Sequence, residues 1–449
     1  MRVLLVPNIF FPDPPGGTEV GVLELAKALR RGGIEAIVAA PHWEGEFVEH
    51  YEWEAIPVWR YRVTERSMKI GALDMEDPEQ SYQFELLLRQ TGAEVLSLHA
   101  WMASVGVNQI MAAQRLGIPV VVTCHLVNVT CPRGSGMRWG KIPCDLVFDA
   151  IRCPACVVQL KGVPLTLAYL SSYLSLGMRV DRDESSANPL LRGLRLAAKM
   201  RTLKTNRKKL YEFVEEFVVQ NRWYAQVLKH NGIPEKKIKL APVCLYRKPV
   251  NISLQLNAFN RSGKIVTGFM GRLSRAKGVD LLVKAIKGIP KDRRLEVRIH
   301  GIVQSEEERI YRNEIRTIAA HDARIHLLDQ LPDDQIFSEL AKWDLLCVPS
   351  RVQDMRPQVI LEAFSVGLPI IGAALGGIPD LIENGRNGFL FPPDDVKALR
   401  DLLLRVTSEP DLLRRLRKNL PPVQGIESLA SFMADLYQSV KSRHDSQLI

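Results

Sequence analysis

The sequence VPSRVQDMRPQVILEAFSVGLP, residues 348–369, leads from a short apolar run through a polar loop into an apolar helical pattern. Pro357 suits the first position of that helix, because proline lacks an N–H and its φ is already helical. Asp354 is then expected in the loop at the mouth of the helix. Glu362 is expected on the second turn, where a carboxylate among apolar neighbours is costly unless it is hydrogen-bonded. Strand, loop and helix in this order predict one unit of a parallel α/β sheet.

The same order of apolar runs and helical patterns continues on both sides of this stretch. Such alternation predicts α/β architecture with doubly wound, Rossmann-like parallel sheets. Because 449 residues exceed what one hydrophobic core supports, we expect two such domains facing each other across a cleft. The expected boundaries are 1–245 for an N-terminal acceptor-side domain, 246–422 for a C-terminal nucleotide-sugar-binding domain, and 423–449 for a helix that packs back on the N-terminal domain. Strands are expected at 3–6, 37–40, 95–98, 120–123, 217–220, 265–270, 295–299, 325–328, 345–349 and 369–372.

The composition is that of a globular protein. Hydrophobic residues make up 46% of the chain and charged residues 24%, which excludes a disordered chain and a membrane bundle. The opening MRVLLVPNIFF has one basic residue and an apolar run interrupted by Pro7, so a buried strand is expected there in place of a secretory signal. Residues 163–178 are apolar but interrupted, and they are fewer than the roughly 20 residues that span a bilayer. A cytoplasmic protein is therefore expected.

A glycine-containing loop joins a strand to a helix in GFMGRLSRAKGVD, residues 268–280. Such a loop offers backbone N–H groups and a positive helix end to phosphate. Arg272 and Lys277 add fixed charge, because arginine grips two phosphate oxygens through its fork and lysine acts as a point charge. The alternative is a pair of solvated surface bases, which the spacing alone does not exclude.

Glu362 has two interpretations on these residues alone. A ribose diol would satisfy it, because the two hydroxyls donate hydrogen bonds that a carboxylate accepts. The alternative is a helix cap at Asp354 and a Glu362 paired with a neighbouring base. Both interpretations stay open at this point.

Several motifs resemble those of family 4 glycosyltransferases, which are retaining enzymes of the GT-B fold. PPGGTE at 14–19 resembles the opening glycine loop of that family. The other motifs follow one another in the family's order: the loop with Arg272 and Lys277, the pair Asp354 and Glu362, ALGGIPD at 374–380, and NGRNGFLFP at 384–392. The likeness is strong over 265–400, clear over 1–40 and 93–125, and faint elsewhere.

The resemblance implies a site for a nucleotide-diphosphate sugar. In that site Arg272 and Lys277 neutralise the diphosphate, and Glu362 holds the ribose hydroxyls. Asp354 contacts the transferred sugar, and no cofactor is required for transfer because the two cations replace a metal. The implied donor-binding residues are Gly16, Gly17, Arg272, Lys277, Asp354, Met355, Arg356, Pro357 and Glu362, and the implied catalytic residues are Asp354, His125, Arg272 and Lys277.

The chain departs from the family at position 354, where the family usually has glutamate. Aspartate keeps the charge but is shorter by one methylene, which leaves the sugar contact open. On the acceptor side, His99 and His125 follow predicted strands, and the positions that resemble them contact acceptor or donor sugar. The alternative for each is a structural histidine.

A cysteine cluster lies in an insertion at about 125–160 of the N-terminal domain. Its spacing is C-x12-C-x8-C-x2-C, and the closing C-x2-C is a usual half-site for tetrahedral zinc. The alternative is a set of buried or free thiols, because the first loop is long. The structural zinc site would use Cys131, Cys144, Cys153 and Cys156.

A basic stretch follows the insertion. No acidic residue lies between Ser185 and Tyr211, while eight basic residues lie from Arg192 to Lys209. With the leucines among them, they predict an amphipathic helix whose partner is an anionic membrane surface. A solvated face near the acceptor is the alternative.

Together these features predict a retaining glycosyltransferase that moves a sugar from a nucleotide-diphosphate sugar to a glycan or lipid-linked acceptor. The expected setting is cell-surface polysaccharide or glycolipid synthesis, in the cytoplasm or peripheral on the inner face of the membrane, without a nucleic-acid partner. Two alternatives remain: a nucleotide-sugar epimerase or hydrolase on the same fold, and a non-catalytic basic protein that binds membranes or polyanions through a vestigial site.

Overall fold

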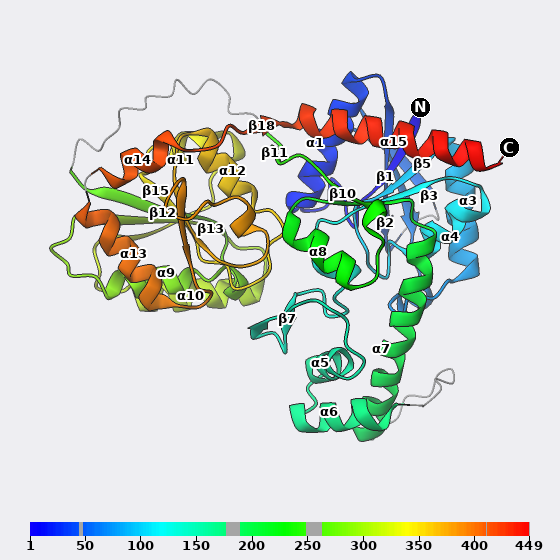
Figure 1. Ribbon diagram of the computed structural model, residues 1–449, viewed down its shortest axis with the longest axis horizontal. Helices are drawn as coiled ribbons and strands as arrows, with labels where there is room; N and C mark the ends of the chain where they lie inside the picture. The colour runs from blue at the N-terminus through cyan, green and yellow to red at the C-terminus, as the bar shows by residue number, and fades with distance from the viewer. Residues whose placement is uncertain (45–47, 177–188, 248–262, 410, 449) are drawn as a thin grey trace. The chain divides into compact units, whose positions relative to one another are not determined.

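The computed structural model describes residues 1–44, 48–176, 189–247, 263–409 and 411–448 (Figure 1). The chain forms two compact units. Unit 1 combines residues 1–242 with 426–449, and unit 2 comprises residues 243–425. Residues 248–262, shortly after the expected domain boundary at 245, lie outside the described residues.

Unit 1 is built on an eight-stranded sheet with the order β10-β9-β6-β5-β1-β2-β4-β3. All neighbouring strands are parallel except β3 and β4, which form an antiparallel hairpin at one edge. The central strands are almost wholly buried, as expected where helices cover both faces of a parallel sheet. The strands are β1 (Arg2–Val6), β2 (Glu35–His42), β3 (Val48–Trp53), β4 (Ile56–Arg62), β5 (Val95–Leu98), β6 (Val120–Thr123), β9 (Glu216–Val219) and β10 (Ile238–Leu240).

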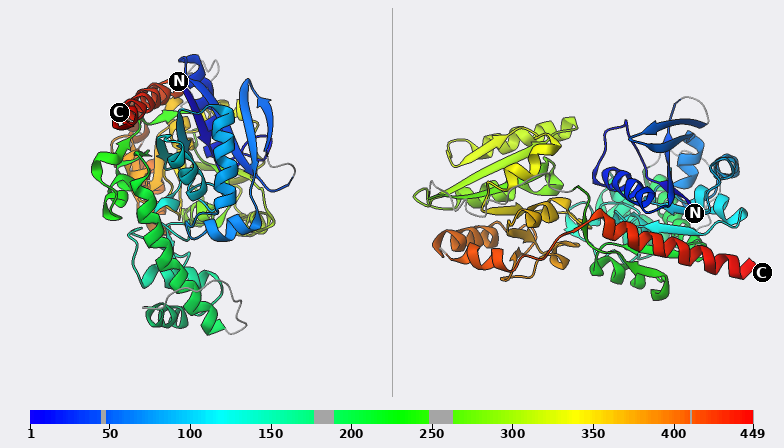
Figure 2. Two further views of the ribbon diagram at one scale, coloured as in Figure 1. Left: turned by 90° about the vertical axis from the view of Figure 1, so that its right-hand side faces the viewer. Right: turned by 90° about the horizontal axis from the view of Figure 1, so that it is seen from above.

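Helices connect these strands, and the last helix of the chain packs on the first (Figure 2). Helix α4 begins only at Val107, and eight residues separate it from the end of β5 at Leu98. The carboxamide oxygen of Gln109 accepts the N–H of Gly106 (2.8 Å) and fixes that start. The helices are α1 (Gly17–Arg31), α2 (Glu65–Gly71), α3 (Pro78–Thr91), α4 (Val107–Arg115), α8 (Arg222–His230) and α15 (Ile426–Leu448).

An insertion between β6 and β9 forms a helical subdomain of unit 1 (Figures 1 and 2). It begins with a small antiparallel ribbon of β7 (Met137–Arg138) and β8 (Ile142–Pro143). Three helices that contact one another follow: α5 (Arg152–Leu160), α6 (Leu165–Leu174) and α7 (Pro189–Glu212). The basic stretch from Arg192 to Lys209 lies in α7, as the predicted helix requires, and α7 ends at Glu212. No helix in the described parts of the chain is long and apolar enough to cross a membrane.

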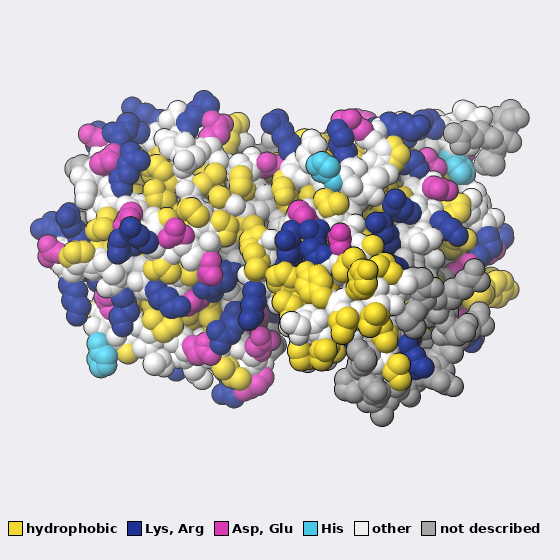
Figure 3. Space-filling view, turned by 60° about the horizontal axis from the view of Figure 1, so that its bottom comes forward, with side chains coloured by type: hydrophobic (Ala, Val, Ile, Leu, Met, Phe, Trp, Pro, Cys, Tyr) yellow, Lys and Arg dark blue, Asp and Glu magenta, His cyan; other side chains and the backbone are white. Residues whose placement is uncertain are grey.

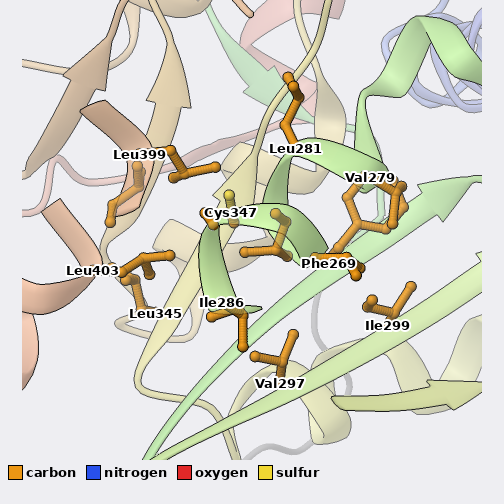
Figure 4. Packing of buried hydrophobic residues seen from close by; sticks show 14 of the residues in the cluster. Phe269, Val279, Leu281, Ile286, Val297, Ile299, Leu345, Cys347, Leu399 and Leu403 are labelled. Atoms are coloured by element: carbon orange, nitrogen blue, oxygen red, sulfur yellow. The ribbon is translucent and has the colours of Figure 1, made fainter. Parts of the chain in front are cut away.

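Unit 2 is a six-stranded, wholly parallel sheet with the order β14-β13-β12-β15-β16-β17. Side chains of its strands and helices form a continuous apolar core, which includes Phe269, Ile299, Cys347 and Leu403 (Figure 4). Together with unit 1, it confirms the predicted α/β architecture of two doubly wound sheets. The strands are β12 (Ile265–Arg272), β13 (Leu295–Ile302), β14 (Ile325–Leu328), β15 (Leu345–Val348), β16 (Ile370–Ala373) and β17 (Gly388–Phe391). The helices are α9 (Val279–Lys287), α10 (Glu306–Ala319), α11 (Ile336–Leu340), α12 (Gln358–Ser365), α13 (Val396–Ser408) and α14 (Leu412–Lys418).

Candidate functional site

Two loops of unit 2 meet beyond the carboxyl ends of β12 and β15. Gly278, between the first loop and α9, has a φ of +68°, which favours glycine. A Cβ at this position would lie 2.1 Å from the carbonyl oxygen of Pro349, so only glycine lets the two backbones approach. The N–H of Arg351 also donates to the carbonyl of Ala276 (2.8 Å). The phosphate loop predicted from sequence is therefore attached to the loop that carries Asp354.

Lys277 and Asp354 form an ion pair across these loops. The Lys277 Nζ lies 2.6 Å from Asp354 Oδ1, and the Ser350 hydroxyl donates to Oδ2 (2.5 Å). The Lys277 side chain is 31% exposed and the Asp354 side chain 17% exposed, so the pair is still reached by solvent. The structure thus brings together two residues to which the resemblance gives separate roles, one on the diphosphate and one on the sugar.

The motif at 374–380 holds the backbone of Asp354 in place. The N–H of Gly377 donates to the Asp354 carbonyl (2.8 Å). Gly376 has a φ of +61°, and a Cβ there would lie 2.7 Å from the same carbonyl oxygen. Gly376 is therefore required by the position of the Asp354 loop, whereas Gly377 contributes only its backbone N–H.

Arg272 is the last residue of β12, and Glu308 orients it. Its Nε and Nη2 both donate to Glu308 Oε1, at 2.9 and 2.5 Å. Glu308 is itself fixed, because its Oε2 accepts the N–H of Gln304 (2.7 Å). The Arg272 side chain remains 55% exposed, so its guanidinium is held in one direction and still accessible. Sequence reasoning missed Glu308.

Glu362 lies on α12, half-buried, and within the described residues its carboxylate accepts no hydrogen bond. Burial raises the pKa of Glu362 to about 7, and the positive charge of Arg247 offsets only part of this effect. A carboxylate in this position is stabilised by any ligand that donates hydrogen bonds to it. The interpretation in which Glu362 is paired with a neighbouring base therefore has no hydrogen bond to support it.

A second ion pair, between Arg351 and Asp280, connects the same loops, and the sequence did not indicate it. Arg351 donates to both oxygens of Asp280, at 2.5 and 2.9 Å. Burial would raise the pKa of Asp280, but hydrogen bonds from Arg351, Lys284 and Tyr311 outweigh burial and lower the pKa below its usual range. Asp280 is therefore ionised and ties α9 to the loop after β15.

The residues between Asp354 and α12 have mostly structural side chains. Arg356 is buried, its Nη2 donates to the Tyr246 hydroxyl (2.6 Å), and its guanidinium lies 4.9 Å from the centroid of that ring. Met355 is buried as well. Pro357 is the N-cap of α12 and not its first residue, because its ψ of 114° is extended. If Met355, Arg356 and Pro357 contact a donor, they would therefore do so through backbone atoms.

The glycine loop of unit 1 lies at the start of α1. Gly16 and Gly17 are exposed, and a Cβ on Gly17 would meet no atom within 4 Å. The carboxylate of Glu19 accepts the N–H of Gly16 (2.8 Å), and burial raises the pKa of Glu19. The open space beside Gly17 is compatible with the close approach of a ligand to this helix end.

His99 and His125 also lie in unit 1, in direct contact and beside a small cavity that both line. His99 Nδ1 lies 2.9 Å from His125 Nε2, and the rings stack with centroids 5.2 Å apart. Burial lowers the pKa of His99 to about 3, so His99 is neutral at physiological pH. Gln220 Nε2 lies 3.4 Å from His125 Nδ1 and is a further polar group that the sequence did not indicate.

The four cysteines proposed for zinc lie in the insertion, and within the described residues none of them forms a disulfide. Cys156 Sγ accepts the N–H of Trp139 (3.2 Å), and Cys153 Sγ accepts the N–H of Asp149 (3.3 Å). Burial raises the pKa of Cys153 to about 11, and it also raises the pKa of Cys131. In the described part of the chain, no group of three or more His, Cys, Asp or Glu side chains is arranged to hold a metal ion. The zinc site therefore stays a prediction without a ligand geometry to support it.

Comparison with protein families gives two matches. Residues 15–143 match the model described as Glycosyltransferase Family 4, and residues 255–421 match the model described as Glycosyl transferases group 1. Among curated proteins, the amylovoran biosynthesis glycosyltransferase AmsK of Erwinia amylovora is 28% identical over 39% of this chain and 43% of its own length. The colanic acid biosynthesis glycosyltransferase WcaL of Salmonella typhimurium, which carries the qualifier putative in its name, is 27% identical over 32% of this chain and 40% of its own length. The matches thus span less than half the length of these relatives.

Solved structures match over nearly the whole chain. Sucrose-phosphate synthase from Thermosynechococcus elongatus has a TM-score of 0.65 at 16% identity, covering 98% of this chain and 99% of that one. HepE from Anabaena, in complex with UDP and glucose, has a TM-score of 0.63 at 17% identity, covering 98% and 100%. At these identities the likeness establishes the fold. The chain therefore belongs to the glycosyltransferases of the GT-B fold that carry a Glycosyltransferase Family 4 domain and a Glycosyl transferases group 1 domain.

Proposed function

We propose that the protein is a retaining glycosyltransferase that moves a sugar from a nucleotide-diphosphate sugar to a glycan or lipid-linked acceptor. The observation that carries this proposal is in unit 2, where two oriented, accessible cations lie near the strand ends and a carboxylate on α12 accepts no hydrogen bond from the described residues. The names of the relatives support a role in cell-surface polysaccharide or glycolipid synthesis. The complexes of HepE with UDP-glucose and of starch synthase IV with ADP support a nucleotide-sugar donor.

In the proposed reaction Lys277 leaves Asp354 for the diphosphate, and Arg272 binds the same group from the end of β12. Glu362 accepts hydrogen bonds from the ribose hydroxyls, and the released Asp354 carboxylate contacts the sugar. The bond between the anomeric carbon and the diphosphate breaks, a bond to the acceptor oxygen forms on the same face, and the acceptor proton passes to the leaving phosphate. The two cations stabilise the negative charge that develops there, so no cofactor is required for transfer.

His125 and His99 belong to the acceptor side in this proposal, with His125 closer to solvent. The enzyme would act in the cytoplasm, peripheral on the inner face of the membrane, without a nucleic-acid partner. Zinc in the cysteine insertion would have a structural role only.

A panel of UDP-, GDP- and ADP-sugars tests the proposal by thermal shift, followed by product analysis with acceptor. The expected result is stabilisation by one class of donor and a glycosylated product of retained configuration. Free sugar or an epimerised nucleotide sugar without any acceptor product would indicate the epimerase or hydrolase alternative. No shift with any donor, together with salt-sensitive binding to polyanions, would indicate a vestigial site.

Binding of the donor is expected to weaken about tenfold between pH 8 and pH 6. The pKa of Glu362 is about 7, and ribose hydroxyls donate hydrogen bonds to its ionised form. Below pH 7 the carboxyl is mostly protonated, so it must lose a proton before it binds the ribose. Calorimetric titration with a nucleotide-diphosphate sugar at several pH values measures the effect, since the diphosphate does not titrate in this range.

Glu362→Gln is expected to bind the donor weakly and with no change between the two pH values. The exposed Glu383→Gln variant is the control and should keep the pH dependence of the wild type. A wild-type affinity that is constant over this range would remove Glu362 from the ribose site.

A further inference from the structure

The helix α6 of the insertion has the reverse of the usual distribution of side chains. It buries small and hydroxyl-bearing residues, Ala168, Ser171 and Ser172, against its neighbours. Its large apolar side chains point outward, and 45% of Leu167, 46% of Leu170 and 63% of Tyr173 are exposed. We call this surface the α6 outer face, and its residues are Leu165, Leu167, Leu170, Tyr173, Leu174 and Leu176.

The packing of the insertion prevents α6 from turning this face inward. The small core beneath it contains Ala155, Val158, Ala168 and Ala197. Gly193 of α7 lies so close to α6 that a Cβ there would be 2.7 Å from the Ser171 Oγ. A gap that only glycine and serine fit has no room for leucine, so the exposure of the leucines is built into the subdomain.

Exposed leucines gathered on one helix are unfavourable in water, and such a patch is typical of a surface that another apolar phase covers. Figure 3 shows hydrophobic side chains gathered on the face of the molecule that carries the insertion. The exposed apolar residues of the α6 outer face lie close together on and just after one helix. Other exposed leucines of unit 1, such as Leu86 and Leu240, lie on separate elements.

The charges of the insertion favour an anionic partner. Helices α5 and α6 contain no acidic residue, and α7 has none before Glu212. Lys161, between α5 and α6, and Arg192, near the start of α7, are exposed. The acidic residues of the α6–α7 connection lie at 181, 183 and 184, outside the described residues. A second copy of this chain would bring like charges together, so a negatively charged apolar phase fits better.

We infer that the α6 outer face docks on the surface of a membrane that contains anionic lipids. A helix of ten residues is about 15 Å long, half of the roughly 30 Å hydrocarbon thickness, so α6 lies in the interface and does not cross it. The leucines enter the acyl region, and the basic side chains of the insertion meet the lipid phosphates. This inference rests on the proposed function, in which the enzyme is peripheral on the membrane, and assigns the membrane contact to the α6 outer face.

Co-sedimentation with vesicles of phosphatidylcholine, with and without phosphatidylglycerol, tests the inference on the full chain and without any donor. The triple variant Leu167→Asn, Leu170→Asn, Leu174→Asn should bind phosphatidylglycerol vesicles at least tenfold more weakly than the wild type. The matched control replaces three other exposed apolar residues, Leu86→Asn, Leu240→Asn and Ile310→Asn, and should change binding less than twofold. All six positions are exposed, so both variants should keep the melting temperature and the donor-induced thermal shift.

The possible outcomes distinguish docking through the α6 outer face from a peripheral location in general and from the enzymatic proposal. Loss of vesicle binding in the α6 variant alone supports the inference. Equal binding by the wild type and the α6 variant overturns it but leaves a peripheral location intact. A wild type that binds no vesicles overturns both, while the donor-induced shift still decides the enzymatic proposal. A dimer in size-exclusion chromatography that the α6 variant dissolves, without any vesicle binding, would assign the face to a second copy and also overturn the inference.

Discussion

Replacing Lys277 with alanine is expected to weaken the binding of a nucleotide-diphosphate sugar by about 100-fold while the fold is retained, because a charge-assisted hydrogen bond contributes roughly 1.5–3 kcal/mol. A second effect adds to this loss. The Lys277 ammonium is the ion-pair partner of Asp354, at 2.6 Å, so its removal leaves a carboxylate that repels the incoming phosphates. Isothermal titration calorimetry measures the change in affinity, and thermal unfolding checks the fold.

The matched control for this variant is Arg275→Ala, in the same loop. Arg275 pairs with Glu314 on the exposed surface, at 2.5 Å, and should matter little to the donor. The double variant Lys277→Ala, Asp354→Asn should recover part of the lost affinity, because it removes the unpaired carboxylate as well. A Lys277→Ala protein with unchanged donor affinity would remove Lys277 from the site.

The variant Gly278→Ala is expected to lower the free energy of unfolding by about 4 kcal/mol, which is exceptional for a single methyl group. The positive φ of +68° accounts for roughly 1 kcal/mol of this loss. The remainder comes from the carbonyl of Pro349, which lies 2.1 Å from the new Cβ and forces the two site loops apart. Unfolding in guanidinium chloride measures the loss, and donor binding should disappear even in the fraction that folds.

Gly385→Ala separates the two causes. Gly385 also has a positive φ, +81°, but a Cβ there meets no atom within 4 Å. We expect a loss of about 1 kcal/mol, which is the conformational part alone. Equal losses in the two variants would show that the contact between Gly278 and Pro349 does not constrain the loops.

The sheets could be predicted from sequence where a strand is buried on both faces. The expected strands at 95–98 and 120–123 coincide with β5 and β6, because both are short runs of mostly apolar residues. The hairpin of β3 and β4 was missed, since VEHYEW, residues 48–53, mixes charged and aromatic residues and has no continuous apolar run. The start of α4 has a weak signal for another reason: its N-cap is Gly106 in place of the serine or threonine of a usual capping box, and only Gln109 supplies the second half of that motif.

The charged residues of the candidate site could be selected from sequence, but the contacts that hold them in place could not. Arg272, Lys277, Asp354 and Glu362 could be selected because each lies at a strand end or on a helix that the pattern locates. Their partners lie far away in the sequence, as Glu308 lies 36 residues from Arg272, and only the folded sheet brings them together. The cysteines illustrate the same limit, because spacing along a chain does not fix the directions of four thiols.

The ion pair of Lys277 and Asp354 means that the protein provides a counterion for its own lysine. Every anion that enters must compete with this internal carboxylate, so a singly charged anion gains little from displacing it. A diphosphate, with a charge on each phosphate and Arg272 to receive the second, competes far better. In the proposed reaction, the carboxylate would pair with the ammonium again after transfer, which would assist departure of the nucleotide.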